Sequence, residues 1–240
     1  MSIGKRGLIA AGAALAAGVL AAVALGQEIT PTKINATVTV TPHRAGTPSH
    51  PRGIRIAARG TITTSGGTVP STPQSVDLWL PRDWVYNGAK HPTCALATLT
   101  RRGPGACPPQ SIMGQLELGH VEDRPSTSPP QATIVNGGQT KMYFSVRLLD
   151  PAPAHGVVTA TITRLRSPRW SYRLHADIPS SLRVVSGIPI ALQSFDGSIG
   201  RGDWIATTHC PPDHRWRYRL RMTYPSGPLV DTGGELTCRS

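Results

Sequence analysis

Side chains that can bind metals or transfer protons gather in one short run near the C-terminus. Residues 209–214 read HCPPDH, which makes His209, Asp213 and His214 candidate metal ligands. Two prolines stiffen this run, and the chain has no Cys-x-x-Cys pair. We therefore expect no bound metal and no cofactor. A secreted hydrolase or metal-dependent enzyme that uses these three residues stays as an alternative.

Motifs of the common enzyme classes are missing from the sequence. There is no Gly-x-Ser-x-Gly nucleophile elbow, no His-Glu-x-x-His zinc motif and no P-loop. We therefore assign no catalytic residue, and a non-catalytic role is favoured.

Four cysteines are present: Cys94, Cys107, Cys210 and Cys238. An even number of cysteines in an exported chain is typical of disulfide bonds. Three pairings are possible, and the simplest joins sequence neighbours, Cys94 with Cys107 and Cys210 with Cys238. Each bond would stabilise the fold by roughly 3 kcal/mol in the loop-entropy account.

A row of arginines is the second chemical feature. If residues 215–224 form a strand, alternate side chains point to opposite faces. One face then carries Trp216, Tyr218, Leu220, Met222 and Tyr224, and the other carries Arg215, Arg217, Arg219 and Arg221. Four unpaired arginines cannot be buried, so their face meets water, carboxylates or an anionic ligand. The alternatives are an anion-binding face and a solvated face whose arginine stems cover apolar surface.

This segment has a near-copy 46 residues upstream. Residues 169–184 (RWSYRLHADIPSSLRV) and 215–230 (RWRYRLRMTYPSGPLV) share eight of sixteen positions without a gap. The match indicates a duplicated strand-turn unit. If both copies join one sheet, Arg173 extends the anion-binding candidates. The aromatic residues point away from the arginines, so a nucleic-acid stacking surface is not expected.

The net charge of the chain is +12. A basic surface suggests anionic partners, here an envelope polymer or an acidic lipid. The abundance of arginine, alanine, glycine and proline is also typical of a GC-rich genome, which offers a second explanation of the charge. The oligomeric state is left open.

Short apolar runs separated by turn residues indicate an all-β fold. Expected strands lie at residues 34–40, 54–62, 76–80, 132–135, 142–148 and 157–163. Proline and glycine are frequent, and no segment has convincing helical periodicity. Many short strands at this spacing predict an antiparallel β-sandwich, immunoglobulin-like or jelly-roll-like, with long loops.

The N-terminus has the layout of a secretory signal peptide. Lys5 and Arg6 precede an uncharged apolar run over residues 7–25, and small residues follow at a cleavage position after Gly26. We predict a signal helix over 1–26, with a single-pass membrane anchor as the alternative. Residues 27–240 then form one β-sandwich domain, or two lobes split near 123–131.

Scattered blocks resemble a pattern in uncharacterised secreted proteins of actinobacteria. The blocks are Leu80-Pro81, Pro92-Thr93-Cys94, the run CPPQSIMG at 107–114, FDGSIG at 195–200 and Cys210-Pro211-Pro212. The chain has Leu116 where those proteins often have glycine. The resemblance implies export, disulfides and a β fold, and it implies no activity.

Together these observations predict an exported, disulfide-stabilised β-rich protein of the cell envelope or extracellular space. Its expected role is that of a non-catalytic surface or binding protein with a basic face. A purely structural envelope protein is a further alternative.

Overall fold

The computed structural model describes residues 33–64, 70–119, 130–225 and 229–239. The predicted signal peptide and most of the segment 123–131 lie outside these residues. The strands are β1 (Lys33–Thr41), β2 (Arg52–Gly53), β3 (Arg55–Thr63), β4 (Ser75–Pro81), β5 (Trp84–Tyr86), β6 (Ile112–Gly119), β7 (Gln131–Asn136), β8 (Lys141–Leu148), β9 (Ala154–Arg164), β10 (Trp170–Asp177), β11 (Val184–Val185), β12 (Ile188–Pro189), β13 (Ser194–Ile199), β14 (Ile205–Thr207), β15 (Arg215–Thr223) and β16 (Val230–Thr237). The helices are short: α1 (Leu96–Arg102), α2 (Ser180–Arg183) and the 3-10 turns Gly88–Lys90, Pro104–Ala106 and Pro109–Ser111.

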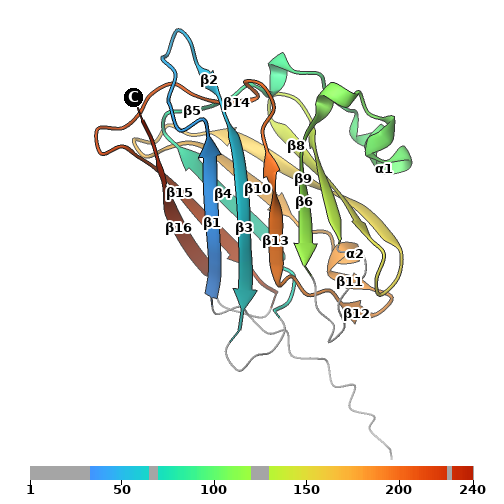
Figure 1. Cartoon of the computed structure of the whole chain (residues 1–240). Helices are drawn as coiled ribbons and strands as arrows, with labels where there is room; N and C mark the ends of the chain where they lie inside the picture. The colour runs from blue at the N-terminus through green and yellow to red at the C-terminus, as the bar shows by residue number, and fades with distance from the viewer. Residues whose placement is uncertain (1–32, 65–69, 120–129, 226–228, 240) are drawn as a thin grey trace, which may run out of the picture.

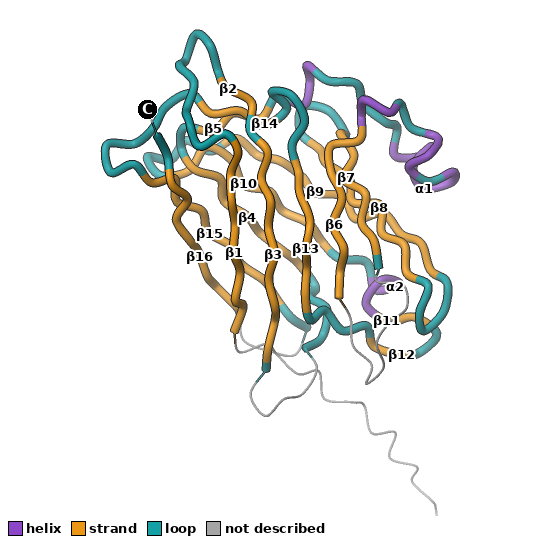
Figure 2. Tube along the Cα trace, in the orientation of Figure 1, coloured by secondary structure: helices purple, strands orange, loops and turns teal. Residues whose placement is uncertain are grey.

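Within these residues, one large antiparallel sheet of 11 strands dominates the fold. Its order is β1-β3-β13-β6-β7-β8-β9-β10-β4-β15-β16. The sheet curves so far that its first and last strands, β1 and β16, contact each other, which makes it nearly closed and barrel-like (Figures 1 and 2). The predicted antiparallel β class is confirmed. The immunoglobulin-like or jelly-roll-like sandwich is not, because a single continuous sheet forms both layers seen in Figure 1.

Strands from both sides of residues 123–131 belong to this sheet. β6 precedes the segment and β7 follows it, and the two strands pair with Leu116 opposite Ala132. The division into a signal peptide and one domain or two lobes stays a prediction.

The near-repeat found in the sequence has a clear place in the sheet. Its two strands, β10 and β15, both pair with β4, one on each side. Arg173 and Arg219, which are equivalent in the two copies, both lie opposite Trp79 of β4. Leu174 and Leu220 likewise both lie opposite Leu78. The two copies are therefore arranged about a shared central strand.

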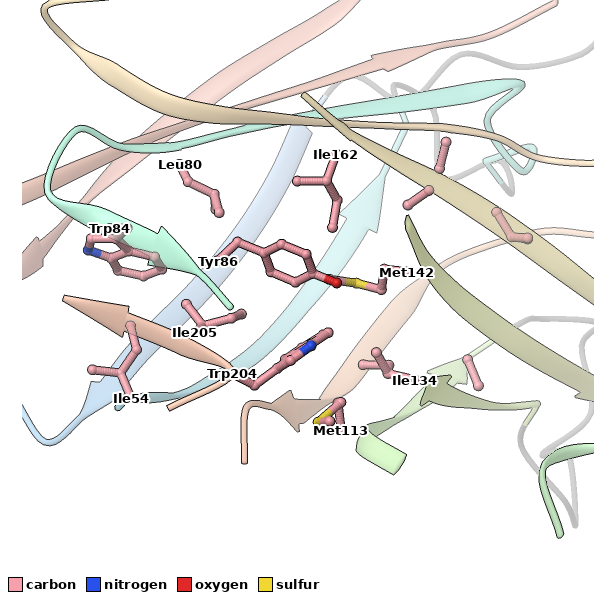
Figure 3. Packing of buried hydrophobic residues seen from close by; sticks show 14 of the residues in the cluster. Ile54, Leu80, Trp84, Tyr86, Met113, Ile134, Met142, Ile162, Trp204 and Ile205 are labelled. Atoms are coloured by element: carbon pink, nitrogen blue, oxygen red, sulfur yellow. The ribbon is translucent and has the colours of Figure 1, made fainter. Parts of the chain in front are cut away.

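A small sheet, β2-β14-β5, closes one end of the large sheet, which we call the aromatic end. Trp84 and Trp216 pack edge to face with ring centroids 5.9 Å apart, and Tyr86 and Trp204 do so at 5.3 Å. Figure 3 shows Tyr86 and Trp204 pointing into the interior among aliphatic side chains. Ring contacts of this kind fill the interior at this end.

A buried amide organises the aromatic end. The Asn136 side chain is fully buried, and its oxygen accepts hydrogen bonds from the Tyr86 hydroxyl and the Trp204 indole N–H at 3.2 and 3.0 Å. Its nitrogen donates to three loop carbonyls, those of Gly88, His91 and Pro92. Because both atoms of the amide are satisfied, this polar group is compatible with burial.

The opposite end, which we call the α2 end, carries the helix α2 and the two-residue strands β11 and β12 (Figure 1). Here β4, β9 and β16 begin, and β6, β8, β10 and β15 end. α2 packs on the start of β9, where Leu182 lies directly above Gly156.

Two disulfide bonds join sequence neighbours, in agreement with the simplest expected pairing. Cys94 bonds to Cys107 and Cys210 to Cys238. The first bond holds α1 against the outside of the sheet, where Leu99 packs with Val135 in a small second core. Such bonds indicate an oxidising environment outside the cytoplasm.

In the described part of the chain, no helix has the length and apolar character needed to cross a membrane.

Candidate functional site

The interior of the large sheet contains an apolar cavity of about 280 Å³. It lies in the half of the interior towards the α2 end. Inward-facing side chains of several strands line it: Leu78 of β4, Leu118 of β6, Phe144 of β8, Leu174 of β10 and Leu220 of β15. Alternation along each strand brings these residues to one side of the sheet.

The cavity wall offers almost no polar group. Thr72 carries the only polar side chain in the lining, and its hydroxyl donates to the carbonyl of Ile190 at 2.6 Å. The described residues of the wall carry no acid, base or free nucleophile. Their chemistry suits the binding of an apolar group.

Several large side chains in the wall are only partly buried although they point inward. Leu78 is half-buried, whereas Leu80, two residues further along β4, is 5 % exposed. If a side chain points inward and still has accessible surface, it must border space that no other side chain fills. The cavity thus reflects incomplete packing rather than small residues alone.

The predicted arginine face lies on the outer surface of the same sheet. Arg173, Arg219 and Arg221 surround the Trp79 ring, with guanidinium carbons 5.6, 5.1 and 5.4 Å from its centroid. The structure brings these arginines together with Arg215 and Arg217 across β10, β4 and β15. The expected inward face is also present, because Trp216, Met222 and Tyr224 are buried.

Carboxylates accompany every arginine of this face. Arg215 and Arg217 both contact Glu235, and Arg217 also pairs with Asp213. On the same face, Asp231 accepts hydrogen bonds from Arg219 at 2.8 Å and Arg221 at 3.1 Å, and Asp77 accepts one from Arg173 at 2.8 Å. Most of the positive charge is therefore balanced locally, and anion binding by this face stays a prediction.

Pairing with arginines lowers the pKa values of two carboxylates on this face. Hydrogen bonds from Arg219, reinforced by Arg221, lower the pKa of Asp231 to about 2. Burial would raise the pKa of Asp77, but the hydrogen bonds and charges of Arg173 and His175 outweigh it and lower that pKa. Both carboxylates stay charged at neutral pH.

The structure does not bring His209, Asp213 and His214 together as a metal centre. The Asp213 carboxylate binds Arg217, and the Cys210 sulfur is in a disulfide. Among the residues that the structure describes, no group of three or more His, Cys, Asp or Glu side chains can hold a metal ion.

A serine–histidine contact, which the sequence did not suggest, lies on the outer face beside α1. The Ser145 hydroxyl and the His155 Nε2 are 2.9 Å apart. Ser145 is only 3 % exposed, so its hydroxyl is not accessible to a substrate. We assign it no catalytic role.

The cavity was also missed in the sequence, although the alternating aliphatic residues that line it were visible. Compared with protein-family models, curated proteins and solved structures, the chain matches none of them. Function is therefore inferred from the cavity and the surface.

Proposed function

We propose that this protein is a non-catalytic binding protein that works outside the cytoplasm and holds an apolar, aliphatic ligand inside its sheet. The single observation that carries the proposal is the aliphatic cavity at the α2 end. Ligand pockets usually have volumes of roughly 300–1,000 Å³. A cavity of about 280 Å³ is at the lower limit of that range and suits a slender ligand such as an alkyl chain.

The energetic cost of such a cavity supports occupation. Empty apolar space destabilises a protein by about 24 cal/mol per Å³. The unoccupied cavity therefore leaves the protein less stable than a filled interior would. An aliphatic ligand would recover much of this free energy by restoring contacts with the wall.

We propose further that the protein is exported. The protein reaches the envelope or the extracellular space through the predicted signal peptide, and it belongs among the secreted actinobacterial proteins that it resembles. The two disulfides support this location. The intact mass of protein from its native host, with and without reductant, tests cleavage after Gly26 and both bonds.

The cavity itself is tested by a matched pair of substitutions. Ala176 faces the cavity from β10, and Thr161 is exposed on the neighbouring strand β9. We expect Ala176→Leu to reduce binding of a dye that fluoresces in apolar surroundings by at least tenfold. We expect Thr161→Leu to bind as the unchanged protein does, because its side chain stays outside.

Organic extraction of the natively purified protein, followed by mass spectrometry, gives an independent test. We expect an aliphatic lipid in near-stoichiometric amount, reduced in Ala176→Leu. If dye binding is absent, or is equal in both variants, the cavity is not a binding site.

A second candidate function is adhesion to an anionic envelope polymer or acidic lipid. It is favoured by the grouping of Arg173, Arg219 and Arg221 around Trp79. Replacement of Arg215, Arg217, Arg219 and Arg221 by serine tests it. Unchanged sedimentation with purified cell wall or acidic vesicles would show that the arginines serve only their carboxylate partners.

A further inference from the structure

A cation is hydrogen-bonded to residues that line the cavity. Leu182 of α2 and Ile178, which precedes α2, both line the cavity, and Arg183 follows Leu182 directly. The Arg183 Nε donates to the carbonyl of Ile178 at 3.2 Å, and the Arg183 carbonyl accepts from the amide of Ile190, another lining residue, at 2.8 Å. Side chain and backbone thus both fix Arg183 to residues that line the cavity.

Among the residues that the structure describes, only the Nε of the Arg183 guanidinium has a hydrogen-bond partner, and its terminal nitrogens have none. Across the described ranges, none of the ion pairs involves Arg183. The carboxylate of Asp177, which is close in the sequence, interacts instead with His175 at 3.4 Å. This sets Arg183 apart from the arginines of the outer face, which are all matched with acids.

Exposed apolar side chains adjoin the same cation. Val184 and Ile188 of the β11–β12 hairpin are 43 % and 42 % exposed. Their neighbours Val185 and Ile190 are buried in the main core. Within the described residues, the α2 end therefore offers an apolar interior, exposed apolar side chains and, at Arg183, a positive charge without a carboxylate partner.

We propose that the ligand is a single-chain amphiphile with an anionic headgroup, whose chain occupies the cavity and whose headgroup binds Arg183. This inference rests on the proposed function and adds the ligand's charge and orientation. A cavity wall without polar groups leaves the headgroup at the rim, and a guanidinium presents paired N–H groups that match a carboxylate or a phosphate. The two headgroups share this chemistry, so both are tested.

Calorimetric titration with three ligands of equal chain length tests the inference: laurate, dodecyl phosphate and the neutral dodecanol. We expect one or both anions to bind the full chain at least tenfold more tightly than the alcohol, as a charge-assisted hydrogen bond predicts. The anion whose affinity exceeds that of dodecanol by the larger factor identifies the headgroup.

Three variants separate charge from fold. Arg183→Gln should bring the anions and the alcohol to equal affinity, whereas Arg183→Lys should keep part of the preference. Arg102→Gln, an exposed substitution on α1, is the control and should keep all of it. Circular dichroism and thermal unfolding check that each variant is folded.

The possible failures are distinguishable. If all three ligands bind the unchanged protein equally, the cavity binds alkyl chains and the role of Arg183 is wrong. If the anion preference survives in folded Arg183→Gln, another group holds the headgroup. If no ligand binds, the proposed function fails and this inference fails with it.

Discussion

Strands of one large sheet run through both ends of the interior, but the two ends are packed in opposite ways. At the aromatic end, Trp204 and Trp216 are completely buried, and the Asn136 amide donates to three carbonyls of the loop after β5. At the α2 end, the same strands turn leucines and alanines towards a cavity. Rings and a saturated amide fill space and fix geometry, whereas aliphatic side chains of unequal size leave space between them.

This contrast suggests a division of labour along the sheet. The aromatic end holds the strands in place, so the α2 end can tolerate a void without loss of the fold. Binding regions are commonly found where packing is least complete.

The largest effect is expected at Asn136. Asn136→Leu removes the hydrogen-bond partner of the Trp204 N–H, the Gly138 N–H and the carbonyls of His91 and Pro92. The Tyr86 hydroxyl keeps its contacts with the carbonyls of Gly138 and Lys141. At 1–3 kcal/mol for each buried group left unsatisfied, we expect a loss of about 3–5 kcal/mol or more. Urea unfolding measures it, and a loss below about 1 kcal/mol would contradict the structural role of this end.

The sharpest comparison uses two leucines of one strand. Leu80→Ala removes packed atoms at the aromatic end and should cost about 2–5 kcal/mol in unfolding free energy. Leu78→Ala enlarges an existing cavity and should cost clearly less, because fewer contacts are lost. Equal costs would mean that the two ends are equally well packed.

A substitution that fills the cavity should stabilise the protein, whereas the two leucine truncations destabilise it. In the ligand-free protein, Ala176→Leu should raise the free energy of unfolding by about 0.5–2 kcal/mol, because the new side chain occupies empty space. Thermal unfolding of lipid-extracted protein measures this gain, with Thr161→Leu as the reference. Destabilisation of Ala176→Leu alone would show that the space is too small for a ligand.

The smallest effect on stability is expected at low pH, where Asp231 of the outer face becomes protonated. The pKa of Asp231 is lowered to about 2, so its contribution to stability is complete above its unfolded value of about 4 and is lost as the pH falls towards 2. For a partly exposed pair we expect up to about 1 kcal/mol. The difference in unfolding free energy between the unchanged protein and Asp231→Asn should shrink below pH 4 and vanish below about pH 2. A difference independent of pH would point to packing instead.

Local patterns in the sequence predicted local structure well. Alternation along residues 215–224 gave both faces of β15, because the side-chain period of a strand is a local property. The short helix α1 escaped notice because it buries a single side chain, Leu99, and so has no apolar period.

Long-range features were beyond the sequence. The order of the strands depends on pairings such as Leu78 with Leu220, which are far apart in the chain. The cavity was hidden for the same reason, since Leu78 and Leu80 have the same side chain and the same alternation. Only the neighbours that the fold supplies distinguish a packed leucine from one that lines a void. The acids that neutralise the arginine row likewise come largely from β16 and β4.

The near-closure of the sheet has a consequence for contacts with other chains. Open strand edges are templates on which other chains add and aggregate. Here the chain beyond β1 is joined to the chain beyond β16, because Ala45 donates to the carbonyl of Arg239 and Arg239 donates to that of His43. The Cys210–Cys238 disulfide fixes the end of β16 beside this seam. The two edges thus lie against one another and are less open to strands of other chains.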